Sequence, residues 1–250
     1  MSTWLFDLGN TGLKFACWRE GQLGDVHRID HEGVRFAPDW TEQLPARFHT
    51  AWIASVGPAA LAVELIDALT ARGRRISMAR TQRQFAGMRI AYAQPGRLGV
   101  DRFLAMLAAR ARDRGPWLVV GIGTALTIDL LDADGVHRGG RIAPSPTLMR
   151  ESLHARAPHL SPAGGTNVIF AADTDSALAS GCEGAALALV EQSQQAAVAL
   201  LGSQPRILLH GGGAATLTPA LPDAIMSPSL VLEGLAQWSC VLASTGASRD

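Results

Sequence analysis

The stretch VVGIGTALTIDLL, residues 119–131, decides the fold because it has the pattern of an apolar strand, a Gly-Thr turn and a second apolar strand. A close echo of it, LFDLGNTGLKFACW, occupies residues 5–18. Each copy has a glycine two positions after a distinctive residue, which is Asp7 in the first copy and Gly121 in the second. The repeat predicts that one strand–turn–strand unit occurs twice, with a carboxylate in the first copy alone.

The elements around the two copies follow the same order in each half of the chain. In the first half, strand patterns over residues 3–9, 13–19, 23–30 and 50–57 precede a helix pattern over 58–73. In the second half, strand patterns over 116–123, 125–135 and 136–144 precede an Ala-rich helix over 176–202, a strand over 205–213 and a helix over 230–244. This order predicts an α/β protein of two duplicated domains, each a mixed β-sheet with flanking helices.

We expect the joint between the two halves near residues 112–117, which gives an N-terminal domain over 1–114 and a C-terminal domain over 115–250. Ligands of duplicated α/β proteins tend to bind at strand ends in the cleft between the halves. The two echoing turns would then present backbone N–H groups to one polyanionic ligand.

Composition excludes several classes of protein. Hydrophobic residues make up 48% of the 250 and charged residues 18%, which fits a globular protein with a sizeable core. The net charge is zero, so no electrostatic footprint for nucleic acid or an anionic membrane is expected. The sequence has no signal-peptide pattern and no apolar run of the ~20 residues that span a bilayer. Three widely spaced cysteines fit free thiols, so a cytoplasmic protein is expected.

The segment DLGNTGLK, residues 7–14, has the residue types that a Mg²⁺-nucleotide requires. Asp7 supplies a carboxylate at a strand end, Gly9 allows a sharp turn, and Lys14 supplies a cation. An ordinary hairpin with Asn and Gly as turn formers is the alternative. The echo at residues 121–129 favours the functional interpretation.

Three further segments carry candidate residues. Asp101 and Arg102 begin a periodic helix after a Pro/Gly loop, although a helix-capping role is, taken by itself, the better explanation of the aspartate. The HGGG segment at 210–213 would allow close backbone approach to a ligand, and a plain tight turn is the alternative. Thr174 precedes the Ala-rich helix, where an N-cap is the simpler explanation. No histidines are spaced as metal ligands, and His210 is the one beside the glycines.

Taken together, the motifs DLGNT…K, Y…P…LGVDR, GTALTID, GGRIAP, DT…SG and HGGGA resemble those of type III pantothenate kinases in order and spacing. That family belongs to the superfamily of acetate and sugar kinases, heat-shock ATPases and actin, and the resemblance covers essentially the whole chain. It implies two ribonuclease H-like domains, a homodimer, and ATP-dependent phosphorylation of pantothenate to 4′-phosphopantothenate, the first step toward coenzyme A.

The resemblance also implies roles for individual residues. The ATP phosphates and adenosine would be bound by Asp7, Leu8, Gly9, Asn10, Thr11, Gly12, Leu13, Lys14, Gly123, Thr124, Gly211, Gly212 and Gly213, with Asp7 near Mg²⁺. Pantothenate would be bound by Tyr92, Gly99, Val100, Asp101, Arg102 and Thr174, with Asp101 as the catalytic base and Thr174 supplied by the partner subunit.

This sequence departs from the family pattern at Gly121. The family usually has an aspartate there that is associated with a bound monovalent cation, potassium or ammonium, and glycine offers no side-chain oxygen. Asp129 on the returning strand is another carboxylate in the same segment. Two other functions stay open: a noncatalytic regulatory relative of the same fold, and a kinase for another small hydroxylated metabolite.

Overall fold

The computed structural model describes residues 2–246, which form two compact units. The first unit comprises the residues up to Asp113 together with those from Ser229 onward, and the second comprises Arg114–Pro228. The boundary near residue 114 agrees with the predicted joint. The C-terminal helix departs from the prediction, because it packs within the first unit rather than the second.

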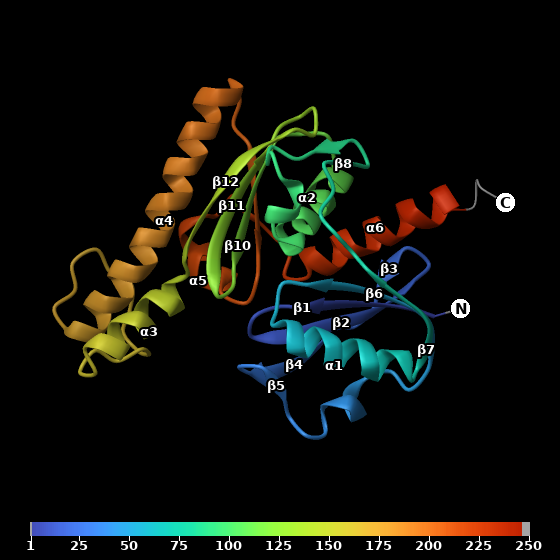
Figure 1. The fold of residues 1–250 in the computed structure, drawn as a ribbon. Helices are drawn as coiled ribbons and strands as arrows, with labels where there is room; N and C mark the ends of the chain where they lie inside the picture. The colour runs from blue at the N-terminus through green and yellow to red at the C-terminus, as the bar shows by residue number, and fades with distance from the viewer. Residues whose placement is uncertain (1, 247–250) are drawn as a thin grey trace. The chain divides into compact units, whose positions relative to one another are not determined.

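The first unit is built on a mixed sheet whose main strands follow the order β5-β4-β2-β1-β6-β7, with β3 paired to β2 (Figure 1). The strands are β1 Thr3–Leu8, β2 Gly12–Arg19, β3 Gln22–Leu23, β4 His27–Glu32, β5 Arg35–Phe36, β6 Phe48–Ser55 and β7 Gly73–Met78. Strands β1, β2 and β4 are antiparallel neighbours, whereas β6 and β7 are parallel to β1. The strands expected over residues 3–9, 13–19 and 50–57 are thereby confirmed as β1, β2 and β6, whereas the strand expected over 23–30 is divided between β3 and β4.

Apolar alternation along these strands builds the core of the first unit. Phe6, Leu8 and Leu13 are fully buried together with residues of helix α1, Ala59–Thr70. Leu61 and Leu65 recur at helical spacing, so one face of α1 packs on this sheet. No helix within residues 2–246 combines the length and apolar character required to cross a bilayer.

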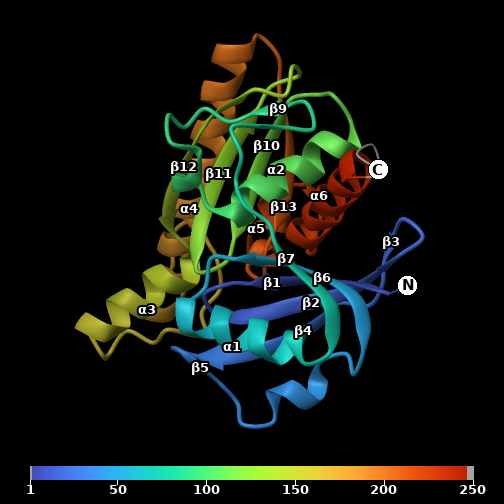
Figure 2. The ribbon, with the colours of Figure 1, turned by 45° about the vertical axis from the view of Figure 1, so that its right-hand side comes forward.

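Two helices of the first unit, α2 at Val100–Arg112 and α6 at Leu230–Gly246, pack side by side (Figure 2). Gly234 permits the close approach, because a Cβ there would overlap the carbonyl oxygen of Leu104. Arg112 and Glu233 form an ion pair at 2.7 Å between the same helices. The short hairpin of β8, Gln84–Phe85, and β9, Met88–Arg89, adds a stacked contact between Phe85 and Trp238.

The second unit repeats the arrangement in the order β12-β11-β10-β13-β14. Its strands are β10 Trp117–Ile122, β11 Ala125–Leu131, β12 His137–Pro144, β13 Arg206–His210 and β14 Ile225–Met226. Its helices are α3 Pro146–Arg156, α4 Thr174–Leu201 and α5 Ala214–Leu217. Again three antiparallel strands are followed by two parallel ones, which confirms the duplication. Helices α4 and α5 cover the face that carries the core of this unit.

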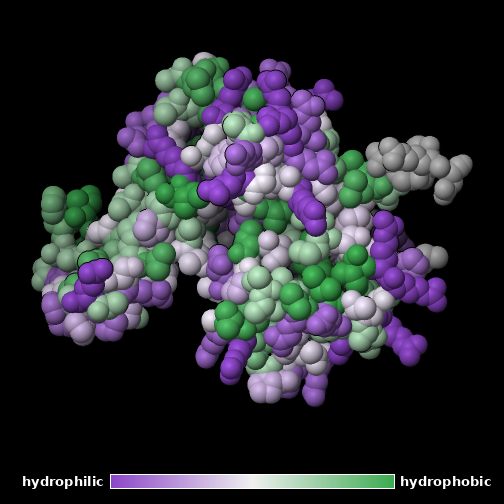
Figure 3. Space-filling view, in the orientation of Figure 1, coloured by the Kyte–Doolittle hydropathy of each residue, from purple (hydrophilic) through white to green (hydrophobic). Residues whose placement is uncertain are grey.

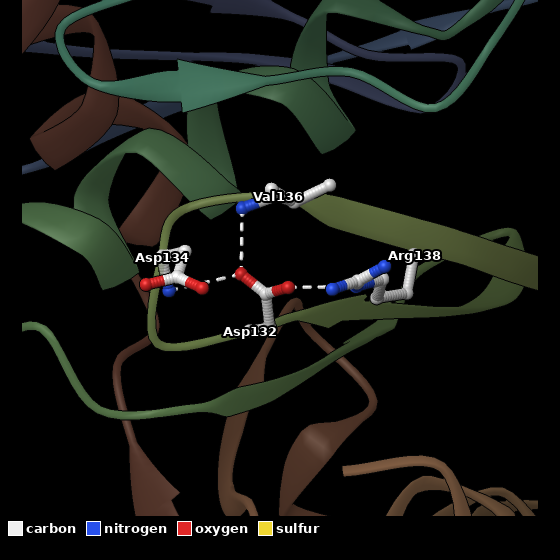
Figure 4. Close-up of polar contacts among 4 residues, drawn as sticks. All are labelled: Asp132, Asp134, Val136 and Arg138. Carbon is white, nitrogen blue, oxygen red and sulfur yellow. Dashed lines mark hydrogen bonds and ion pairs between the residues drawn. The ribbon is translucent and has the colours of Figure 1, made fainter.

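The turn between β11 and β12 is fixed by the carboxylate of Asp132 (Figure 4). Its Oδ1 accepts hydrogen bonds from the backbone N–H groups of Asp134 at 3.0 Å and Val136 at 2.8 Å. Its Oδ2 pairs with Arg138 at 2.6 Å. Every polar contact drawn there is internal to the turn, so Asp132 has a structural role.

Candidate active site

The turn between β1 and β2 is held tightly by backbone contacts in the first unit. Gly9 donates its N–H to the Gly12 carbonyl oxygen at 2.9 Å. A Cβ at Gly57 would lie 2.5 Å from the Gly9 oxygen, so glycine is needed for the chain to pass the turn at this point. Asn10 and Thr11 remain exposed at the tip, where their side chains and N–H groups are accessible to a ligand.

His31, which the sequence analysis did not single out, supports this turn from β4. Its Nε2 lies 3.0 Å from the Gly9 carbonyl oxygen, and because a carbonyl only accepts, Nε2 carries the proton. The side chain is 8% exposed, and its Nδ1 is buried without a hydrogen-bond partner in residues 2–246. Ile29 is the other buried residue of β4, and a histidine in such a strand gives no local signal for this contact.

Asp7 lies near the end of β1, opposite Lys14 of β2 and beside Ala54 of β6. Its pKa is raised from 3.8 to about 7, chiefly by burial and then by the negative charge of Asp101, while the positive charge of Lys14 acts in the opposite direction. The structure therefore brings Asp101 close to the pair Asp7 and Lys14, which the sequence placed in one segment. A carboxyl group whose charge is disfavoured in this way gains stability when a cation is bound beside it.

Asp101 occupies the first turn of α2, and Gly99 is the N-cap of that helix. A Cβ at Gly99 would lie 2.5 Å from Oδ1 of Asp101, so this glycine leaves room for the carboxylate. The position combines a partly buried acid with the positive end of a 13-residue helix.

Tyr92 and Arg102 meet beside the start of the same helix. Nη1 of Arg102 donates to the Tyr92 hydroxyl at 3.4 Å, and Arg102 is 6% exposed. A guanidinium held in this way offers a directed positive charge to a carboxylate ligand. Among the residues predicted to bind the substrate, the structure thus brings Tyr92 to Arg102 and Gly99 to Asp101, and Val100 lies between these pairs in the first turn of α2.

In the second unit, the echoing turn follows β10. Gly123 donates its N–H to the Ala125 carbonyl oxygen at 3.0 Å, and Gly123 and Thr124 are exposed at the tip. Gly211 has φ of 93°, and a Cβ there would overlap the carbonyl of Ile122. Gly213 donates to the same oxygen at 2.9 Å, so the glycine-rich segment after β13 packs directly against the end of β10.

Thr174 lies at the exposed start of α4 in the second unit. The N-cap of that helix is Asp173, whose side chain accepts from the Ser176 N–H at 2.8 Å, so Thr174 is not the cap. Its contribution to the substrate site stays a prediction.

Comparison with known proteins decides the family. The family model for type III pantothenate kinase matches residues 4–196. A protein from Stenotrophomonas maltophilia strain K279a named type III pantothenate kinase is 54% identical over 239 residues, covering 96% of this chain and 98% of its own. The chain belongs to the type III pantothenate kinase family. Kinases of this family phosphorylate pantothenate in coenzyme A biosynthesis.

Solved structures similar to this pantothenate kinase family member support the fold. A crystal structure from Campylobacter jejuni, titled a Baf family transcriptional activator, gives a TM-score of 0.64 at 18% identity and covers 98% of this chain and 99% of its own. The activator of 2-hydroxyisocaproyl-CoA dehydratase from Clostridium difficile, with bound ADPNP, gives 0.56 at 12% identity, with coverage of 100% and 98%. The expected pair of ribonuclease H-like domains is confirmed.

Residues 2–246 contain no cluster of three or more His, Cys, Asp or Glu side chains able to hold a metal. Mg²⁺ commonly takes one or two carboxylates and completes its coordination with substrate phosphates and water. The raised pKa of Asp7 fits such a site, because a cation there would stabilise the ionised carboxylate.

Asp129, the other carboxylate near Gly121 in the sequence, is committed elsewhere. It is 2% exposed and contacts Nε2 of His137 at 3.0 Å. In the sheet register it lies opposite Val119, whereas Thr127 lies opposite Gly121. The structure therefore does not bring Asp129 into the position that a carboxylate at residue 121 would occupy.

Proposed function

We propose that this protein transfers the γ-phosphoryl group of ATP to the terminal hydroxyl of pantothenate, giving 4′-phosphopantothenate and ADP. The observation that carries the proposal is the convergence of Asp7, Lys14 and Asp101, in which the charge of Asp101 acts on the pKa of Asp7. Phosphoryl transfer needs a positioned hydroxyl, a cation at the phosphates and charge stabilisation, and these residue types match those needs.

Each step follows from a named group. Asp101 accepts the hydroxyl proton of pantothenate while the hydroxyl oxygen bonds to the γ-phosphorus and the bond from phosphorus to the β–γ bridging oxygen breaks. Lys14 and the N–H groups of Asn10 and Thr11, at the exposed tip of the turn, would bind the phosphates. Asp7 would hold Mg²⁺, which supplies charge neutralisation when bound.

Arg102 and Tyr92 provide the basis for substrate choice. Pantothenate carries a carboxylate, and the buried Arg102 guanidinium is suited to bind it while the Tyr92 hydroxyl fixes the guanidinium's orientation. In the second unit, Gly123, Thr124 and the glycines at 211–213 would bind the nucleotide through close backbone approach.

A homodimer is part of the proposal, with Thr174 completing the pantothenate site of the partner subunit. In the loop between α3 and α4, the side chain of Ile169 is 91% exposed and that of Phe170 is 95% exposed. Figure 3 shows apolar surface on this part of the second unit. Hydrogen bonds from the N–H groups of Thr166 and Val168 to serines of α4 hold the loop in place. Exposed apolar side chains on an ordered loop support a protein–protein contact.

We place the reaction in the cytoplasm, without nucleic-acid or membrane partners. The three cysteines are free and the net charge is zero.

The test is an ATP-consumption assay with the purified protein. The alcohols compared are pantothenate, its amide, in which an uncharged group replaces the carboxylate, and unrelated small alcohols. The proposal expects pantothenate to give the highest kcat/KM and the amide to lose most of it. ATP consumption that is equal for all the alcohols would contradict the substrate assignment. If ATP is consumed with no alcohol in the set, the assignment of the protein as a kinase is contradicted.

A further inference from the structure

Gly121 leaves a space in the second unit that two polar side chains enter. In the sheet register, Gly121 of β10 lies between Thr127 of β11 and His210 of β13. A Cβ built at Gly121 would lie 2.7 Å from Nε2 of His210 and 2.7 Å from Oγ1 of Thr127. Both atoms therefore border the space above the glycine, and a side chain at residue 121 would meet them unless they shift.

At the equivalent position in the sheet of the first unit, the large side chain stands on the central strand and the small one on its parallel neighbour. There Asp7 occupies the centre, between Lys14 and Ala54, and Ala54 is the small residue on the parallel strand. The two copies thus differ at both positions: a carboxylate beside alanine in the first, a glycine beside histidine in the second. The imidazole thus borders the space that a carboxylate at residue 121 would need, and we call this pair of differences the exchange.

His210 lies beside the glycine-rich segment that the proposed function assigns to the nucleotide. It is the last residue of β13, directly before the glycine-rich segment 211–213, and Gly121 lies two residues before the exposed Gly123. Its neighbours Ile207 and Leu209 point into the core under α4, so the alternation of the strand directs His210 to the opposite face. The side chain is partly exposed there.

We propose that His210 is a nucleotide-binding residue whose ring N–H donates to an anionic phosphate oxygen of ATP, and that Gly121 exists to admit its ring. The proposal rests on the proposed function, because it takes a nucleoside triphosphate as the ligand of Gly123, Thr124 and the glycines at 211–213. A histidine can donate from the neutral ring or as a cation, and a charge-assisted contact with phosphate is the stronger form. The second unit thereby supplies the hydrogen-bond donor of an imidazole at the sheet position where the first unit supplies the carboxylate of Asp7.

Equilibrium binding tests this without requiring turnover. His210→Ala, His210→Gln and the control His159→Gln, an exposed histidine of the same unit, are titrated with a nonhydrolysable ATP analogue and separately with pantothenate. His210→Ala is expected to weaken analogue binding roughly tenfold to hundredfold, with His210→Gln between it and the wild type because its amide retains a donor. Pantothenate affinity should stay within roughly twofold in every variant.

Unchanged analogue affinity in folded His210→Ala, or a loss confined to pantothenate, would overturn the proposal. The role of His210 and the proposed kinase activity are tested by different measurements, because the kinase activity is judged by phosphopantothenate formation in the wild type. Weakened nucleotide binding in His210→Ala supports this inference whichever alcohol the wild type phosphorylates.

A second set of variants tests the exchange itself. Gly121→Asp should lower the melting temperature, because its Cβ meets His210 and Thr127, whereas Gly121→Asp combined with His210→Ala should recover most of that loss by recreating the pattern of Asp7 and Ala54. A melting temperature for Gly121→Asp equal to that of the wild type, or no recovery in the double variant, would show that the two positions are independent.

Discussion

The imidazole of His31 donates a hydrogen bond at 3.0 Å to the carbonyl oxygen of Gly9, and so ties β4 to the turn that follows Asp7. Replacing His31 by Leu leaves that carbonyl without its donor, which typically destabilises by about 1–3 kcal/mol. We expect the KM for ATP to rise roughly tenfold, with a smaller effect on the KM for pantothenate. Steady-state kinetics with each substrate varied in turn measures both.

His31→Gln is the informative companion, because its amide nitrogen can reach the place of Nε2. It should restore most of the ATP affinity, and Glu32→Gln on the exposed side of the same strand should have no effect. Equal losses of affinity for both substrates in His31→Leu would point to general destabilisation instead.

The raised pKa of Asp7 makes stability depend on pH in a predictable direction. The native state holds this proton up to a pH of about 7, whereas the unfolded state releases it near 3.8. Between these values the native state binds more protons, so the free energy of unfolding falls as the pH rises and then levels off. Asp7→Asn removes the effect, so it should be more stable than the wild type at about pH 8 and similar to it at about pH 4.

Denaturant unfolding of the nucleotide-free protein at both pH values measures this difference. Asp25→Asn, an exposed aspartate in the same unit, serves as the control and should follow the wild type at each pH. A stability difference between Asp7→Asn and the wild type that does not change with pH would contradict the raised pKa.

Gly121 leads to a prediction about monovalent cations. No carboxylate stands at that position, and Asp129 is buried against His137. Turnover should therefore be similar in potassium, ammonium, sodium and a bulky organic cation at constant ionic strength. A strong, saturable requirement for potassium would mean that other oxygen ligands build a cation site.

The proposed dimer can be tested by complementation between two inactive subunits. If Thr174 acts across a two-fold interface, a heterodimer of Asp101→Asn and Thr174→Val contains one site with neither lesion. Mixing the two variants should restore a measurable fraction of turnover, whereas each alone should remain inactive. A verified heterodimer without activity would place Thr174 in the site of its own subunit.

Local patterns explain why so much of the fold was predictable. Alternation and turn residues around Asp7 and Gly121 fixed the strand pairs, and the repeated order predicted the two matching sheets. The location of α6 was not predictable in this way. Its attachment to the first unit depends on Gly234 meeting Leu104, a contact between residues far apart in the sequence.

The candidate site shows the same limit. Asp7 and Lys14 belong to one hairpin, so their proximity follows from the turn, and Asp101 joins them through tertiary packing. His31 gave no signal, because its role depends on a backbone carbonyl 22 residues away. The roles of these residues in catalysis stay predictions.

Product formation by the wild type and Asp101→Asn tests the central claim most directly. The purified proteins are incubated with ATP, Mg²⁺ and pantothenate, and phosphopantothenate is quantified by mass spectrometry beside equilibrium binding of the ATP analogue. The wild type should convert pantothenate to the 4′-phosphate, and Asp101→Asn should lose ~10²–10⁴-fold in kcat while still binding the analogue. No phosphopantothenate from the wild type, or near-normal turnover by Asp101→Asn, would contradict the account.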